Sequence, residues 1–462
     1  MSYKDIVKHI IDNFVFTRIE KEFTFTDVEF SEDNQDISGP SERFFQYFDH
    51  NFYKVGKDYV HDKEIVNFLK TYKKLENLSF DSAMKSDKKI ILEMSLHPVS
   101  GSITPHKTIK ENFIDVLFKD KNLLKKMREG KLFLLLNQGW EPQDFTEKTR
   151  ETDTIENYYE LFNLVFKQYN LPNTSIILMG SNVRNDEFKK QYNPNCNKVS
   201  TIIDNFMEIE SFCAYSKEVK LDLDYSFDEH IDNIKKSNKT LLRVSRTLNG
   251  YRNQMLYFIY KNNYQNKSII EHKTFDTNKI AEVFKLDKDI LEKINNDLPL
   301  VASKYEIGKD FNQPFTSYSN ETIPYDVYKK TIFSWTSTSL PEQINKVYLS
   351  QSTFNPMLFY HPIVWHGQPY HIKYLKSYGY KSYDWLFDES YDNIDKYEWE
   401  MNFNYPKLKS NMRSVEKVMN MDRDKLINKI IDNKDILEHN RNLLIQCKSI
   451  ERIITKFYET TI

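Results

Sequence analysis

Residues 348–392 read YLSQSTFNPMLFYHPIVWHGQPYHIKYLKSYGYKSYDWLFDESYD, and this stretch is the strongest indication of the fold. Ser350 and Ser352 are typical helix-start residues, and an apolar helical face follows them. The run 363–365 is short and apolar, as in a buried parallel strand, and a second helical pattern ends at Gly379. Helix, strand and helix in this order predict a Rossmann-type unit, in which ligands lie beyond the carboxyl ends of the strands.

The same alternation of strands and helices extends along most of the chain. Further strands are predicted at 22–30, 88–96, 131–142, 174–183, 240–245, 268–275 and 328–339, the last with a hydroxyl-rich exit. Strands that alternate with helices of ~10–20 residues indicate parallel, doubly wound sheets. We therefore predict an α/β protein with two Rossmann-like domains at 86–215 and 216–410, joined by a charged linker at 217–239. An N-terminal extension (1–85) and C-terminal helices (411–462) complete the prediction.

Composition limits the class of protein. The 462 residues are 40% hydrophobic, which is enough for sizeable cores, and the formal net charge of −2 does not favour a nucleic-acid partner. Three widely spaced cysteines suit a reducing compartment, so we expect a cytoplasmic protein. We expect neither a signal peptide nor a membrane span. With only 10 glycines the chain has no Gly-rich phosphate loop.

The stretch also resembles a family of viral, phage and bacterial proteins described as glycosyltransferase-like, and more distantly the α-1,3-fucosyltransferases. The residues that carry this resemblance are Ser350, Thr353, Pro356, Pro362, Gly367, Leu375, Gly379, Tyr380 and the run DESYD at 388–392. The resemblance implies a GT-B fold and transfer of a sugar from a nucleotide sugar. A viral member would reside in the host cytoplasm. This chain differs from the family at Gln351 and Ser352, where the family has Glu and Lys.

The resemblance and the strand–helix pattern together suggest a donor site. Arg246 and Arg252 flank the turn after the strand at 240–245, and arginine suits bidentate phosphate contacts. The helix start formed by Ser350, Gln351, Ser352 and Thr353 could bind phosphate through hydroxyl and backbone N–H groups. The structural alternatives are a solvated helix-start arginine and ordinary N-capping.

An inverting glycosyl transfer to a hydroxyl group also requires a general base. Glu141 is the first candidate and Asp144 the second, because both follow a predicted strand at its carboxyl end. A carboxylate in a solvated loop is the alternative for each of them.

We predict no metal site. His361, His366 and His371 are spaced by five residues rather than the three or four that place two ligands on one helix face, so polar packing is favoured. Asp222 and Asp224 form a D-x-D, the pattern of metal-dependent GT-A enzymes, but this short pattern is common by chance.

The function that these patterns favour is metal-independent hexosyl or fucosyl transfer. The donor is a nucleotide sugar, the acceptor a glycan or a protein, and no further cofactor is expected. The differences at Gln351 and Ser352 keep an alternative open, namely an inactive glycosyltransferase-like protein with a structural or glycan-binding role. A GT-A enzyme is a third, weaker interpretation.

Overall fold

The computed structural model describes residues 2–18, 76–95, 106–138, 145–146, 154–185, 187, 199–204, 225–245, 250–272, 274–277, 280, 284–300, 325–337, 346–393, 406–446 and 448–462. The chain divides into two units, and each is described by itself. Unit 1 comprises residues 1–206 and 448–462, and unit 2 comprises residues 207–447. The C-terminal helices, predicted as one region, are divided between the two units.

Unit 1 is built on a six-stranded parallel sheet with the order β2-β1-β3-β4-β5-β6. The strands are β1 (Phe14–Arg18), β2 (Glu76–Asn77), β3 (Lys89–Ser95), β4 (Leu132–Gln138), β5 (Ile176–Gly180) and β6 (Ser200–Ile203). The central strands contain continuous apolar runs such as 132–136, all buried. Such runs form central parallel strands because both of their faces are covered.

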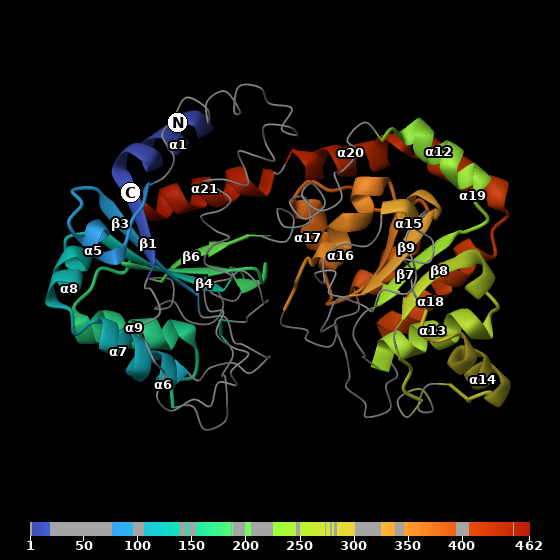
Figure 1. The fold of residues 1–462 in the computed structure, drawn as a ribbon, viewed down its shortest axis with the longest axis horizontal. Helices are drawn as coiled ribbons and strands as arrows, with labels where there is room; N and C mark the ends of the chain where they lie inside the picture. Colours follow the sequence, from blue (N-terminus) through green and yellow to red (C-terminus); the bar gives the residue numbers. More distant parts are fainter. Residues whose placement is uncertain are drawn as a thin grey trace. The chain divides into compact units, whose positions relative to one another are not determined.

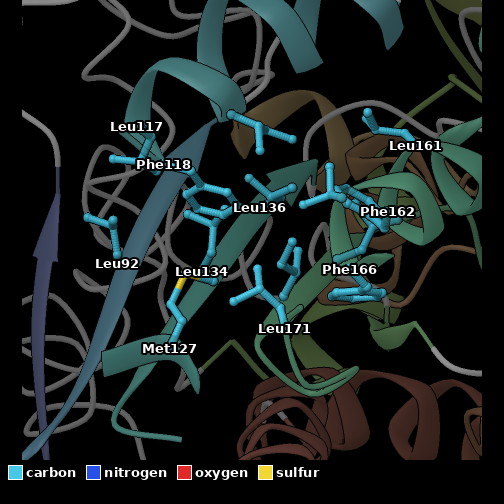
Figure 2. Close-up of a cluster of buried hydrophobic side chains, with 14 of the residues drawn as sticks. Leu92, Leu117, Phe118, Met127, Leu134, Leu136, Leu161, Phe162, Phe166 and Leu171 are labelled. Carbon is cyan, nitrogen blue, oxygen red and sulfur yellow. The ribbon is translucent and has the colours of Figure 1, made fainter. Parts of the chain in front are cut away.

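Helices cover both faces of this sheet (Figure 1). They are α1 (Tyr3–Asn13), α5 (Phe80–Met84), α6 (His106–Ile109), α7 (Asp115–Leu117), α8 (Lys121–Arg128), α9 (Tyr158–Tyr169) and α21 (Lys448–Thr461), with a π-helical turn at Lys110–Ile114. Figure 2 shows the core on the side of α8 and α9, where Leu134 and Leu136 lie close to Phe162 and Phe166. Helix α8 is separate from α7 because the carboxylate of Asp120 accepts hydrogen bonds from the first turn of α8 and so starts a new helix.

Two features of unit 1 differ from the sequence prediction. Residues 14–18 do not belong to a separate extension, because β1 lies inside the sheet between β2 and β3. The last helix, α21, packs on the opposite face from α9, where Phe457 contacts Phe14 and Phe16 at ring-centroid distances of 5.8 and 6.1 Å. The strand predicted at 22–30 lies outside the described residues.

Unit 2 is built on a four-stranded parallel sheet with the order β10-β9-β7-β8. The strands are β7 (Leu241–Ser245), β8 (Ser268–His272), β9 (Phe333–Ser337) and β10 (Ile363–His366). On one face Trp335 contacts Phe258 of α13 (Gly250–Lys261) at 5.8 Å. On the other face Trp365 stacks on His371 of α17 (His371–Ser377) at 4.0 Å. Both units are therefore α/β structures with parallel sheets covered on two faces, which confirms the α/β part of the predicted fold and is compatible with two Rossmann-like domains.

The remaining helices of unit 2 surround this sheet (Figure 1). They are α12 (Phe227–Lys236), α14 (Lys288–Asp297), α15 (Tyr325–Lys329), α16 (Gln351–Phe354), α18 (Pro406–Met419), α19 (Arg423–Asp432) and α20 (Lys434–Ile445), with short 3₁₀ segments at Gln265–Lys267, Asn355–Phe359 and Glu389–Asn393. Part of the predicted linker is in fact α12, whose buried face includes Phe227 and Ile231. No helix in the described parts of the chain has the length and apolar character to cross a bilayer.

The stretch 348–392 forms the predicted sequence of elements with a shorter first helix. Helix α16 has only four residues and passes into a 3₁₀ helix at Asn355–Phe359, because Pro356 lacks the N–H that an α-helix would use. Strand β10 and helix α17 follow as predicted, and Gly379 has φ +95°, a conformation in which glycine avoids strain.

Candidate functional site

The candidate site lies at the carboxyl ends of β7 and β9. The chain passes from β7 to β8 on one side of β7, and then returns to β9 on the other side. Connections that leave two neighbouring parallel strands in opposite directions open a crevice between those strands, and open α/β sheets bind their ligands there. Ser337 is the last residue of β9, and α13 begins at Gly250 shortly after β7.

Two of the predicted donor residues meet at Ser337. Arg252, in the first turn of α13, is 7% exposed, and its Nε donates a 3.2 Å hydrogen bond to Ser337 Oγ. Ser352 Oγ donates a longer, weaker bond of 3.5 Å to the Ser337 carbonyl oxygen. Ser350 Oγ lies 2.8 Å from Ser352 Oγ. The structure thus brings Arg252, Ser350 and Ser352 together around one strand end, although they are about a hundred residues apart in the chain.

Thr353 is placed differently. Its side chain is buried, and Oγ1 lies 3.4 Å from His371 Nε2. It also lines a small cavity together with Ile363, Trp365 and Glu389, with room for little more than a water molecule. Trp365 points away from the face that carries Trp335, so Thr353 is directed to the side of the sheet opposite Arg252.

Of the remaining predicted site residues, only Gln351 belongs to the described part of the chain. Gln351 is the first residue of α16. Glu141, Asp144, Arg246 and the pair Asp222 and Asp224 lie outside the described residues. Their roles stay predictions.

Arg243 is a residue that sequence reasoning missed. It lies in the middle of β7, is 2% exposed, and donates one hydrogen bond from Nη1 to the carbonyl oxygen of Val244. Its Nε and Nη2 have no hydrogen-bond partner in the described parts of the chain. A signal was present in the sequence, because LLRVS places one arginine inside an otherwise apolar strand.

The register of the strands places polar side chains on one face with Arg243. Arg243 pairs with Ile270, two residues before His272, and His366 pairs with Ser337. Since side chains alternate along a strand, Arg243, His272, Ser337 and His366 all point to the face that α13 covers. His272 Nε2 lies 2.9 Å from Asn253 Oδ1, and His366 Nδ1 lies 3.1 Å from Asn411 Oδ1.

The electrostatic environment of this face is positive. Burial, and then the charge of Arg252, lowers the pKa of Arg243 to about 9, so the guanidinium stays charged at neutral pH. Burial, and then Arg243 and Arg252, lowers the pKa of His272 to about 4. Burial, and then Lys407, lowers the pKa of His366 to about 3. Both histidines are therefore neutral at pH 7, and the arginines with Lys407 carry the charge.

Lys407 is fully buried on α18 and has its own carboxylate partner. Its Nζ lies 3.6 Å from Asp392 Oδ1 and donates a 2.7 Å hydrogen bond to the Gln368 carbonyl oxygen. Burial lowers its pKa to about 8, and Asp392 opposes this shift. Asp392 Oδ2 also accepts hydrogen bonds from the N–H groups of Ile372 and Lys373 at the start of α17. Lys407 and Asp392 thus tie α18 to α17.

The three histidines of the stretch 348–392 have separate partners. His361 Nδ1 lies 2.9 Å from Ser334 Oγ, and its Nε2 donates to the Tyr328 carbonyl oxygen at 2.8 Å. His366 contacts Asn411, and His371 contacts Thr353. Within the described ranges no three His, Cys, Asp or Glu side chains form a group that could hold a metal ion.

The arrangement is suited to binding an anion, because guanidinium and hydroxyl groups gather at one strand end beside the N-terminus of α13. No family model, no curated protein and no solved structure shows a significant match to this chain.

Proposed function

We propose that the protein transfers a sugar from a nucleotide-sugar donor to a glycan or protein acceptor, with unit 2 as the donor-binding unit of a GT-B-type fold. The observation that carries this proposal is the meeting of Arg252 and Ser352 at Ser337. Two α/β units with parallel sheets are the building blocks that such a fold requires. The resemblance of the stretch 348–392 to glycosyltransferase-like proteins supports the choice of sugar transfer among the reactions of nucleotide-binding proteins.

The donor's diphosphate would lie against Arg252 and the N-terminus of α13. During transfer the bond from the anomeric carbon to the phosphate oxygen breaks, and the leaving diphosphate gains negative charge. A fixed guanidinium in a buried position stabilises that charge without reorganising water. A metal ion is not part of this proposal.

The acceptor hydroxyl would lose its proton to a carboxylate as its oxygen bonds to the anomeric carbon. Glu141 is the first candidate for this base and Asp144 the second. Both follow β4 in the sequence.

A binding protein without catalytic activity is the second candidate. The observation that favours it is the short hydroxyl group at Ser352, which contacts Ser337 and Ser350, where the resembling family has a lysine. Loss of one charge-assisted bond to phosphate weakens affinity by about ten- to a hundred-fold.

A thermal-shift screen against nucleotides and nucleotide sugars tests the proposal, because a ligand that binds only the folded state raises its stability. We expect a nucleoside diphosphate and its sugar conjugate to raise the melting temperature of the wild type, and Arg252→Ala to abolish the shift. Ser352→Lys should tighten binding about tenfold or more. A melting temperature that no nucleotide changes, in the wild type and in Ser352→Lys, would remove the nucleotide-sugar proposal.

Sugar transfer itself is then measured as release of the nucleoside diphosphate in the presence of candidate acceptors. Nucleotide binding without release, for the wild type and Ser352→Lys alike, would favour the inactive relative. Glu141→Gln should abolish release and leave the thermal shift unchanged if Glu141 is the base.

A further inference from the structure

Arg243 presents an unusual situation for a charged side chain. It is 2% exposed, and its Nε and Nη2 have no partner among the described residues. Isolated buried charges are strongly unfavourable and are normally paired. No carboxylate of the described chain forms an ion pair with Arg243, and Glu271 of the neighbouring strand pairs in register with Val244, so it lies on the opposite face.

The surroundings of Arg243 add positive charge. Arg252 acts on it electrostatically, whereas His272 and His366, which share its face of the sheet, are neutral at pH 7 and supply no charge of either sign. Asparagine oxygens lie next to both imidazoles, Asn253 beside His272 and Asn411 beside His366. These amides are neutral, so they give the imidazoles a fixed orientation without supplying a counter-charge.

We propose that Arg243 and Arg252 together bind a phosphoryl anion, and that this anion is the missing counter-charge of Arg243. A diphosphate fits this pair, because two guanidinium groups can each make bidentate contacts with a different phosphoryl group. For the identity of the natural ligand, this inference rests on the proposed function. Free pyrophosphate and the diphosphate of a nucleotide carry the same phosphoryl groups, so the two arginines could bind either of them. Of the two arginines, we expect Arg243 on strand β7 to contribute more to the attraction of the anion than Arg252 on helix α13.

The test compares two arginine variants, for which we expect different changes in melting temperature and in anion affinity. Arg243→Met keeps the volume of the side chain and removes a charge for which the described residues offer no carboxylate partner, so without anion its melting temperature should equal or exceed that of the wild type. Arg423→Met is the control, because Arg423 donates to the carbonyl oxygens of Ile234, Ser237 and Lys239 and thus has a structural role. Arg423→Met should melt lower than the wild type.

Each protein is titrated with inorganic phosphate, pyrophosphate and a nucleoside diphosphate at constant ionic strength. We expect pyrophosphate and the nucleoside diphosphate to stabilise the wild type and Arg423→Met, and Arg243→Met to bind both about ten- to a hundred-fold more weakly. A shift with the nucleotide but not with pyrophosphate identifies the nucleotide as the source, and a shift with both identifies the diphosphate group itself.

Several outcomes would overturn the inference. They are a wild type that no phosphate compound stabilises, an Arg243→Met protein with unchanged affinity, and an Arg243→Met protein that melts well below the wild type yet keeps its anion shift. If Arg243→Met does not fold, Arg243→Lys replaces it, with an expected loss of affinity of several-fold, and unchanged affinity overturns the proposal. Sugar transfer that is insensitive to Arg243 would contradict this inference alone, whereas pyrophosphate binding without sugar transfer would contradict the proposed function alone.

Discussion

Among single residues, buried charged side chains with a partner of opposite charge are important for the stability of unit 2. Lys407 is fully buried and Asp392 is 4% exposed, and Asp392 both pairs with Lys407 and accepts two N–H groups at the start of α17. Removal of one member of a buried pair leaves the other as an uncompensated charge. The pair therefore has more influence on stability than an ion pair at the surface.

Asp392→Ala should lower the free energy of unfolding by about 3–5 kcal/mol. Asp388→Ala is the control from the same DESYD run, because Asp388 is exposed and accepts one N–H, from Ser390, so we expect about 1 kcal/mol or less. Urea unfolding followed by tryptophan fluorescence measures both, since Trp335, Trp365 and Trp385 lie in unit 2. Equal losses in the two variants would contradict the importance of the buried pair.

The buried histidines predict a pH dependence for unit 2. Burial lowers the pKa of His272 and of His361 to about 4, of His366 to about 3, and of His230 and His371 well below 6.5. Unfolding between pH 4.5 and 6.5 therefore takes up protons, so stability falls as pH falls through this window, by about 1.4 kcal/mol per pH unit for each proton. Glu389, whose pKa burial raises to about 7, acts in the opposite direction but is outnumbered.

Urea midpoints recorded by tryptophan fluorescence at pH 7.5, 6.5, 5.5 and 4.5 check this expectation. The midpoint should change little above pH 6.5 and then fall steadily. A midpoint that stays constant or rises on acidification to pH 4.5 would show that the histidines do not have the low pKa values that burial implies.

At the scale of elements, helix α21 belongs to unit 1 although it ends the chain. Arg452 Nη2 and Lys456 Nζ lie 3.1 and 3.0 Å from the two carboxylate oxygens of Asp204, which is fully buried just after β6. Phe457 adds apolar contacts to β1. This helix thus closes one face of the six-stranded sheet.

Replacement of both cations, Arg452→Met with Lys456→Met, should destabilise unit 1 by about 2 kcal/mol. This loss of unfolding free energy is smaller than the loss expected for a fully buried ion pair, because the side chains of Arg452 and Lys456 are partly exposed. Lys448→Met is the control in the same helix, since Lys448 and Glu451 form an exposed pair that contributes little. Hydrogen exchange of peptides from β1 and β6 should accelerate only in the double variant, and equal exchange in both variants would refute the assignment.

The elements that the sequence predicts well are those with a single, strong pattern. The buried runs in β3, β4 and β5 and the strand β10 occur close to their predicted positions. Strand β1 was missed because Phe14 continues the helical spacing of Ile6 and Ile10, while the helix in fact ends at Asn13. Local periodicity does not reveal where a chain leaves a helix to join a sheet whose other strands are distant in sequence.

At the scale of the whole molecule, the candidate site could be predicted only in part. The positions of Arg252 and Ser352 after two strands suggested that they meet, because carboxyl ends of parallel strands share one edge. Ser337, the residue at which they meet, was visible only as part of a hydroxyl-rich strand exit. Arg243 was missed because its importance depends on burial and on the lack of a carboxylate partner among the residues that the structure describes, and neither property is local in sequence.

We propose above that the diphosphate of a donor binds at the carboxyl ends of β7 and β9. The most direct measurement is a crystal structure of the protein with a nucleoside diphosphate. We expect phosphate oxygens within about 3 Å of the Arg252 guanidinium, beside Ser337 and the N-terminus of α13. A nucleotide bound at the six-stranded sheet of unit 1 instead, or on the face of unit 2 that carries Trp365, would contradict it.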